Sequence, residues 1–100
     1  MAIKKNSSAS SVIRVAIVDD DRNLADGIAW IIDHQKGFTC VGKYYGYRDS
    51  VRGLEDNPAD VVLMDIGLQG DSGIDCVRDL KKHYPDVQIV MQTVYSAHAQ

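Results

Sequence analysis

Five consecutive residues in the middle of the chain, Val61 to Asp65, constrain the fold more than any other stretch. Four apolar residues are followed by one carboxylate, a pattern typical of a strand that is buried on both faces and ends at a polar loop. In an open parallel sheet, ligands bind beyond the carboxyl ends of the strands. Asp65 is therefore the first candidate for a functional residue.

A second run of the same kind lies near the start of the chain. The residues from Val12 to Val18 are almost entirely apolar and are followed by Asp19, Asp20 and Asp21. Because acidic residues at the start of a helix interact favourably with its positive end, we assign Asp21 to capping the helix that follows. Asp19 and Asp20 would then lie at the same edge of the sheet as Asp65.

The remaining segments alternate between helix and strand. Apolar residues at helical spacing predict a first helix ended by Gly37, a short second helix ended at Asn57-Pro58, and a third ended by Pro85. We expect the first helix to bury Leu24, Ala25, Ile28, Ile31 and Ile32, and the third Ile74, Val77, Leu80 and Tyr84. The strands are expected at 12–18, 38–43, 60–65 and 87–91. Strands joined through helices need parallel, right-handed crossovers, which predicts a doubly wound α/β sandwich.

Composition narrows the class of protein. One hundred residues, 45% hydrophobic and 25% charged, suit one small domain, which we place at 12–100 after a Ser-rich, flexible tail at 1–11. A net charge of -3 argues against nucleic-acid binding by this domain itself. The chain has no apolar segment of membrane-spanning length and no signal-peptide pattern, so we expect a cytoplasmic location. Cys40 and Cys76 are then expected to be reduced thiols.

The predicted strand ends carry the candidate chemistry. The first, third and fourth strands finish at Asp19 and Asp20, at Asp65 and at Thr93. Crowded carboxylates raise each other's pKa, and a hard divalent cation relieves that repulsion. Mg²⁺ binds a few carboxylate oxygens and keeps water positions for a phosphate-bearing substrate. The sequence therefore predicts a magnesium site, in preference to unrelated loop acids.

Four motifs together resemble the receiver domain of two-component response regulators. In chain order they are Val15-Ala16-Ile17-Val18-Asp19-Asp20-Asp21, Val61-Val62-Leu63-Met64-Asp65, Gly70-Asp71-Ser72-Gly73 and Ile89-Val90-Met91-Gln92-Thr93-Val94-Tyr95. The resemblance runs from about residue 12 to 100. It implies a flavodoxin-like, CheY-like fold. The sequence around Thr93 is most similar to that of receivers that precede a LuxR/NarL-type helix-turn-helix domain.

The resemblance also implies a role for each site residue. Asp65 would be the phosphoacceptor for a phosphohistidine on a sensor kinase. Asp20, Asp65 and the backbone carbonyl of Gly67 would hold Mg²⁺, and Asp19 would act mostly through a coordinated water. Thr93 would contact the phosphoryl group and switch a DNA-binding output outside this chain. Phosphoryl transfer of this kind needs positioning and charge neutralisation more than a general base.

The chain departs from the family pattern in two places. Gln69 stands where family members often carry Pro. The family also continues past the position of Gln100, through a fourth helix, a fifth strand with a phosphate-contacting lysine, and a fifth helix. We therefore expect this chain to be phosphorylated more weakly than a longer one, and to associate through the exposed edge of its fourth strand.

Two other functions remain open from the sequence. A phosphohydrolase could use Asp65 as nucleophile and Asp20 as metal ligand, but Gly67 stands where a second acid would be expected. A pseudo-receiver could bind partners without being phosphorylated, although the chain keeps Asp19 and Thr93. We favour a phosphoacceptor that performs no catalytic turnover.

Overall fold

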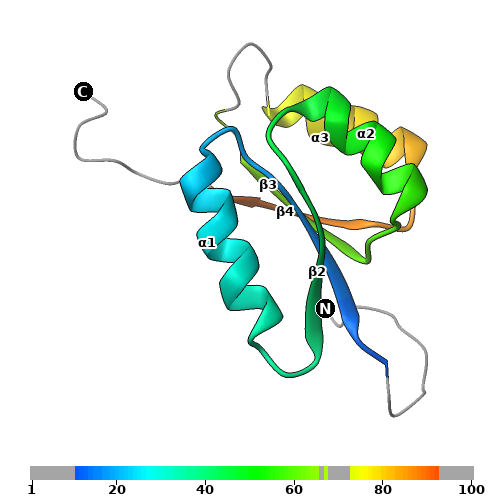
Figure 1. Ribbon diagram of the computed structural model, residues 1–100. Coiled ribbons are helices and arrows are strands. Elements are labelled where there is room, and N and C mark those ends of the chain that lie inside the picture. The colour runs from blue at the N-terminus through cyan, green and yellow to red at the C-terminus, as the bar shows by residue number, and fades with distance from the viewer. Residues whose placement is uncertain (1–10, 66, 68–72, 93–100) are drawn as a thin grey trace.

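The computed structural model describes residues 11–65, 67 and 73–92 of the chain. Its elements are β1 (Ile13–Val18), α1 (Arg22–Asp33), β2 (Phe38–Tyr44), α2 (Tyr47–Asp56), β3 (Val61–Asp65), α3 (Gly73–His83) and β4 (Gln88–Gln92). The strands form one parallel sheet in the order β2-β1-β3-β4. Helix α1 covers one face, and α2 and α3 cover the other (Figure 1). The predicted doubly wound α/β sandwich is confirmed, with each strand end within one residue of its predicted place.

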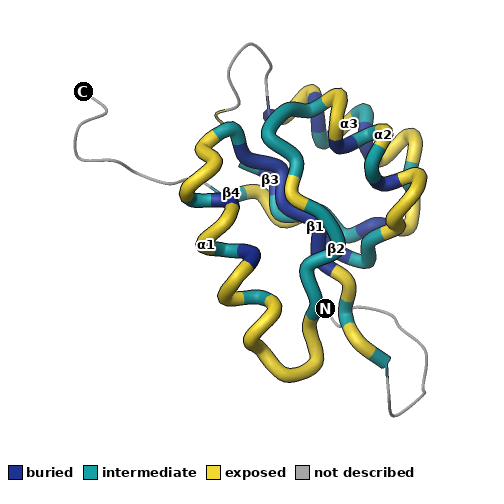
Figure 2. The backbone as a smooth tube through the Cα atoms, in the orientation of Figure 1, coloured by how far each residue is buried: buried dark blue, intermediate teal, exposed yellow. Residues whose placement is uncertain are grey.

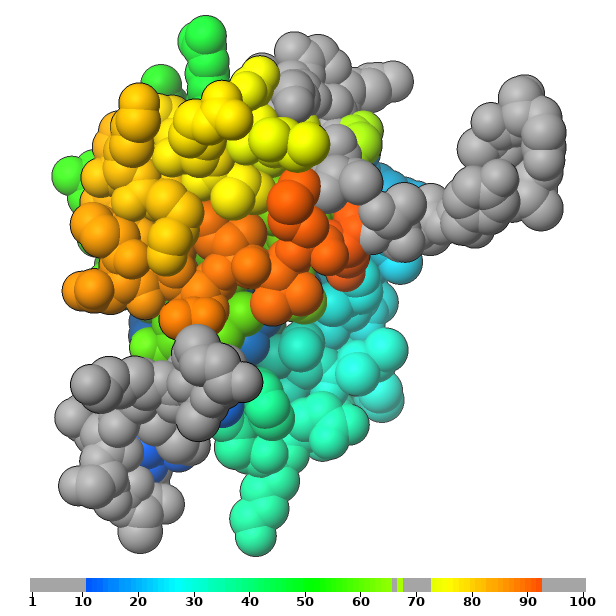
Figure 3. All heavy atoms as spheres, turned by 180° about the vertical axis from the view of Figure 1, so that it is seen from behind, coloured from blue at the N-terminus to red at the C-terminus, as the bar shows by residue number. Residues whose placement is uncertain are grey.

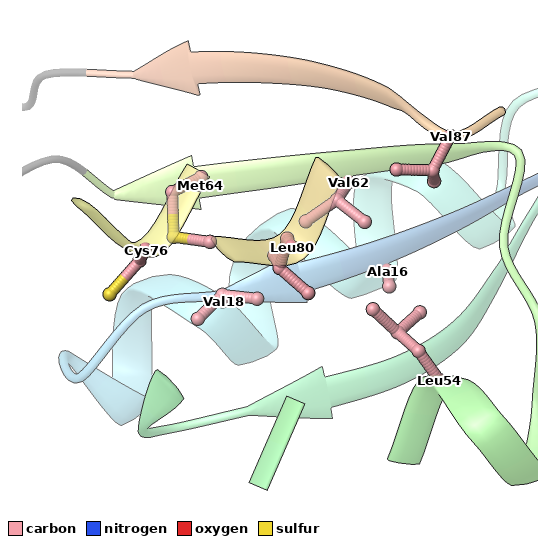
Figure 4. Close-up of a cluster of buried hydrophobic side chains, with 8 residues drawn as sticks. All are labelled: Ala16, Val18, Leu54, Val62, Met64, Cys76, Leu80 and Val87. Carbon is pink, nitrogen blue, oxygen red and sulfur yellow. The ribbon is translucent and has the colours of Figure 1, made fainter. Parts of the chain in front are cut away.

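The core is divided by the sheet into two clusters. Successive residues of a strand point to opposite faces, so Ile17 packs with Ala25 and Ala29 of α1, whereas its neighbour Val18 packs on the side of α2 and α3. That larger cluster consists of Ala16, Val18, Leu54, Val62, Met64, Cys76, Leu80 and Val87 (Figure 4). The central strands are the most buried part of the backbone, and the outer sides of the helices are exposed (Figure 2). Burial on both faces explains why β1 from Val15 onward, and β3 up to Met64, consist of apolar residues.

The start of α1 follows the sequence signal, whereas its end at Asp33, capped by His34, comes before the predicted Gly37. Asp21 is the N-cap, and its Oδ1 accepts a hydrogen bond of 3.1 Å from the backbone N–H of Leu24, as predicted. Beyond the helix, Gly37 has a φ of 89°, a left-handed conformation that glycine adopts without strain. At 12 residues α1 is the longest described helix, and no helix in this part of the chain is long and apolar enough to cross a bilayer.

Two isoleucines that we expected in the core lie on the surface. Ile31 is 54% exposed and Ile74 is 61% exposed. The buried side of α1 is centred on Ala25 and Ala29, so Ile31 falls beyond its border. Ile74 lies in the first turn of α3, next to the buried face of that helix but not on it. Helical periodicity finds the direction of a buried face, but the width of that face depends on the neighbouring elements.

One tyrosine ring explains two glycines in different elements. A Cβ atom at Gly42 of β2 or at Gly53 of α2 would collide with the ring of Tyr44. That ring packs against the larger core cluster. The absent side chains therefore let α2 and β2 approach Tyr44 closely.

This contact predicts opposite effects for two helix glycines. Gly53→Ala should destabilise the domain by about 1–3 kcal/mol, because the ring must move out of its packed position. Gly27→Ala is the matched control, because a Cβ at Gly27 of α1 would meet nothing within 4 Å. It should stabilise the domain by about 0.5–1 kcal/mol through a less flexible unfolded chain. Urea unfolding of the two variants measures both, and a Gly53→Ala variant as stable as Gly27→Ala would contradict the packing of Tyr44.

Candidate functional site

The order of the strands creates a crevice between β1 and β3. From β1 the chain passes to β2 on one side, and from β2 it returns to β3 on the other side of β1. Ligands of open α/β sheets bind where the strand order reverses in this way, outside the carboxyl ends of the strands. Because Val18 pairs with Met64 in register, the next residues, Asp19 and Asp65, lie side by side at this edge. The structure thus brings the predicted acids to the topological switch point.

Three carboxylates meet in the crevice. Asp19, Asp20 and Asp65 each offer one oxygen, and these oxygens lie within 4.8 Å of one another. Asp19 is 1% exposed, and the other two are half-buried. One small cation could therefore bind all three carboxylates from the open side of the crevice.

Asp19 has only half of its hydrogen-bonding capacity satisfied. Its Oδ1 accepts a hydrogen bond of 2.8 Å from the backbone N–H of Asp21. Its Oδ2 is buried and has no hydrogen-bond partner. Burial raises the pKa of Asp19, the hydrogen bond from Asp21 opposes this shift, and the charges of Asp65 and Asp20 add to it. The sequence predicted the repulsion, but burial is the larger cause.

Asp65 is oriented by the backbone that follows it. The N–H of Gly67 donates a hydrogen bond of 3.0 Å to Asp65 Oδ1. The half-buried side chain of Asp65 remains accessible from the crevice. Of the other predicted site residues, Gly67 is thus beside Asp65, and Thr93 lies outside the described residues.

The residues at this edge fit a hard divalent cation. Magnesium prefers oxygen ligands, is held by a small number of carboxylates and retains several waters. A buried carboxylate oxygen without a partner, next to two further carboxylates, supplies such a ligand set and would gain most from a bound cation. Fold and site together define a class: a parallel α/β domain with a cluster of three carboxylates at its topological switch point.

Comparison with known proteins identifies the family. Residues 15–100 match the model of the response regulator receiver domain, and the chain belongs to this family of two-component signalling domains. The chain is 35% identical over 85 residues to the response regulator UvrY of Escherichia coli (strain K12) and 32% identical over 83 residues to the response regulator GacA of Pseudomonas viridiflava. These alignments cover 85% and 83% of the chain but only 39% of each relative. The chain thus spans well under half of these relatives.

Solved structures agree with this assignment. The structure of a LuxR-family two-component response regulator from Aurantimonas sp. SI85-9A1 matches with a TM-score of 0.77 at 25% identity, over 89% of this chain and 64% of that one. The response regulator domain of Thermotoga maritima CheB matches with a TM-score of 0.75 at 29% identity, over 82% of this chain and 60% of that one. The predicted similarity to receivers of LuxR-type regulators is confirmed.

Sequence reasoning missed two side-chain clusters on α1. Arg22 lies over the ring of Tyr45. Trp30 stacks on His34 with ring centroids 3.8 Å apart. The spacing of Trp30 and His34, four residues apart on a helix, could have revealed the second cluster. The first joins two segments and has no local signal.

Proposed function

We propose that this domain accepts a phosphoryl group on Asp65 from a phosphohistidine of a sensor kinase. The observation that carries the proposal is the meeting of Asp65 with Asp19 and Asp20 at the switch point. Family membership supports the same reaction. In this reaction a carboxylate oxygen of Asp65 forms a bond to phosphorus. The bond between phosphorus and the histidine nitrogen breaks, its electron pair stays on the imidazole, and an acyl phosphate results.

Each residue of the site would have its own role in the transfer. Asp20, Asp65 and the carbonyl of Gly67 would hold Mg²⁺, with Asp19 acting mostly through a coordinated water. The bound cation would supply the positive charge that offsets the negative charge of the transferring group. The Gly67 N–H keeps one Asp65 oxygen engaged, which orients the carboxylate. Thr93 would contact the phosphoryl group through its hydroxyl.

Phosphorylation would act as a switch and not as a turnover reaction. A phosphoryl group on Asp65 would draw Thr93 inward and bias an equilibrium between two arrangements of the nearby surface. The readout would be a DNA-binding effector outside this chain, as the relation to LuxR-type regulators suggests. A domain that receives its phosphoryl group from a sensor kinase in this way would act in the cytoplasm, as the sequence predicts.

Acetyl phosphate provides a direct test, because it replaces an unidentified kinase as the phosphoryl donor. The 100-residue chain, incubated with acetyl phosphate and Mg²⁺, should gain the mass of one phosphoryl group, and chelation of Mg²⁺ should prevent this. The label should be lost in mild base, as expected of an acyl phosphate. A folded chain that binds Mg²⁺ but takes no label would instead support an interaction module without phosphorylation.

We also propose that two copies associate through the outer edge of β4. In the described part of the sheet β4 is an end strand, and its Val90 and Met91 are 49% and 39% exposed. Seen from behind, β4 lies at the surface between α3 and α1 (Figure 3). Such an edge is a template for pairing with another strand. Sedimentation velocity should show a dimer that grows with concentration, and a monomer at all concentrations would contradict this proposal.

A further inference from the structure

A small network of charged and aromatic side chains joins α1 to β2. Arg22 is the first residue of α1, and its guanidinium carbon lies 4.4 Å from the centroid of the Tyr45 ring. The Tyr45 hydroxyl donates a hydrogen bond of 3.0 Å to Asp26 Oδ1, and Lys43 forms an ion pair of 3.0 Å with the same oxygen. The hydrogen bond from Lys43, and then that from Tyr45, lowers the pKa of Asp26. The network contains two cations and one anion, so its net charge is positive.

This network borders the acidic crevice. The backbone N–H of Asp19 donates a hydrogen bond of 2.9 Å to the carbonyl of Tyr44. Tyr45, the next residue, therefore lies beside the carboxyl end of β1. Arg22 follows the capping residue Asp21 in sequence. Both members of the stacked pair therefore lie at the edge of the sheet that carries Asp65.

Arg22 stacks on the ring of Tyr45 although three carboxylates precede it directly in the sequence. Guanidinium groups pair strongly with carboxylates, and Asp19, Asp20 and Asp21 are its near neighbours in sequence. Among the residues that the structure describes, however, Arg22 forms no ion pair with them and stacks on Tyr45. An arginine bound in the crevice would occupy the oxygens that a cation needs. On the ring, it keeps its positive charge at the rim.

We propose that Tyr45 positions Arg22 as a steering residue for the anionic phosphoryl donor, and at the same time keeps it out of the magnesium site. The inference rests on the proposed function, because it concerns the donor of that reaction. Three carboxylates and one Mg²⁺ leave a net negative charge in the crevice, which repels a donor such as acetyl phosphate. A cation at the rim reduces this repulsion and raises the rate of encounter.

The first test is the rate of labelling by acetyl phosphate. Arg22→Ala should slow the initial rate by about threefold to tenfold at low ionic strength, and the difference should shrink as salt screens the charge. Arg22→Lys should retain most of the rate. Arg52→Ala removes an exposed cation from α2 and is the matched control, with an unchanged rate. An unchanged rate in Arg22→Ala, or a loss that is equal at all salt concentrations, would overturn the steering role.

The second test is the affinity for Mg²⁺, measured by calorimetry without any donor. Tyr45→Leu removes the ring and should weaken Mg²⁺ binding, because Arg22 is then free to pair with the carboxylates. Adding Arg22→Ala to that variant should restore the affinity, and Tyr45→Phe, which keeps the ring, should bind like the original chain. Equal affinity in a folded Tyr45→Leu variant would overturn the positioning role. If Tyr45→Leu does not fold, the rate test on Arg22 decides.

The two proposals fail in different ways. No labelling of the unsubstituted chain, despite Mg²⁺ binding, would contradict the proposed phosphoacceptor function. Normal labelling that is indifferent to Arg22 and to salt would contradict only the steering inference.

Discussion

Asp65→Asn should abolish phosphoryl labelling while the domain stays folded. The amide has nearly the same shape as the carboxylate, but it lacks the nucleophilic anionic oxygen that forms the acyl phosphate. The hydrogen bond from Gly67 ends on Oδ1, which the amide retains as a carbonyl oxygen. We therefore expect unchanged secondary structure, and label at the background of the assay, when the variant is treated with acetyl phosphate and Mg²⁺ and analysed by mass spectrometry.

Two further variants separate the nucleophile from the cation ligands. Asp20→Asn should lower phosphoryl labelling at limiting Mg²⁺. Labelling should recover at saturating Mg²⁺, because the nucleophile Asp65 is still present. Asp86→Asn removes an exposed carboxylate in a turn at the opposite end of the sheet and should label normally. A label that persists in Asp65→Asn and maps to Asp19 or Asp20 would show that the phosphoacceptor is wrongly assigned.

The position of the site was predictable because two signals coincide. An apolar run that ends in an acid indicates a buried parallel strand, and parallel strands of one sheet end at the same edge. The apolar runs before Asp19 and Asp65 are therefore sufficient to predict that these two residues lie close together. Strand ends were predicted within one residue for the same reason, since the change from apolar to polar is abrupt there.

Features that depend on contacts between segments were not predictable. The register shift of β1 against β2, between Val15 and Ala16, has only an indirect sequence signal, the isolated Gly42 inside β2. The close approach of Gly53 to Tyr44 joins a helix to a strand, and a glycine in a helix does not reveal its neighbour. The stack of Arg22 on Tyr45 likewise joins residues 23 positions apart in the sequence. The near-complete burial of Asp19 also could not be predicted, because the exposure of a residue at a strand end depends on packing with elements that are distant in the sequence.

The burial of Asp19 leads to the second large effect, which concerns stability. Without a cation, Asp19→Asn should stabilise the domain at neutral pH by about 1–3 kcal/mol, the usual cost of a buried polar group without a partner. The amide keeps an oxygen for the Asp21 N–H and places an N–H₂ donor beside Asp20 and Asp65. Urea unfolding in the presence of a chelator measures the gain. Glu55→Gln, an exposed change on α2, is the control and should have little effect.

The pH dependence of this gain has a definite sign. Because burial raises the pKa of Asp19 in the folded state, the native chain holds its proton at pH values where the unfolded chain has lost it. Stability contributed by protonated Asp19 is therefore lost as the pH rises from the ordinary carboxyl pKa through the raised one. The advantage of Asp19→Asn should be absent below this window, grow across it and be constant above it. An advantage that is equally large at acid pH would point to packing instead of charge.

Adding Mg²⁺ should reverse the order of stability of the unsubstituted chain and the Asp19→Asn variant. A ligand that binds only the folded state stabilises it in proportion to the logarithm of its concentration above the dissociation constant. The unsubstituted chain, with three carboxylates in the crevice, should gain stability steeply as Mg²⁺ is added, whereas Asp19→Asn should gain much less. The same charge that weakens the empty fold would thus be the one that binds the cation. If Mg²⁺ stabilised both chains equally, Asp19 would have no part in cation binding, either directly or through water.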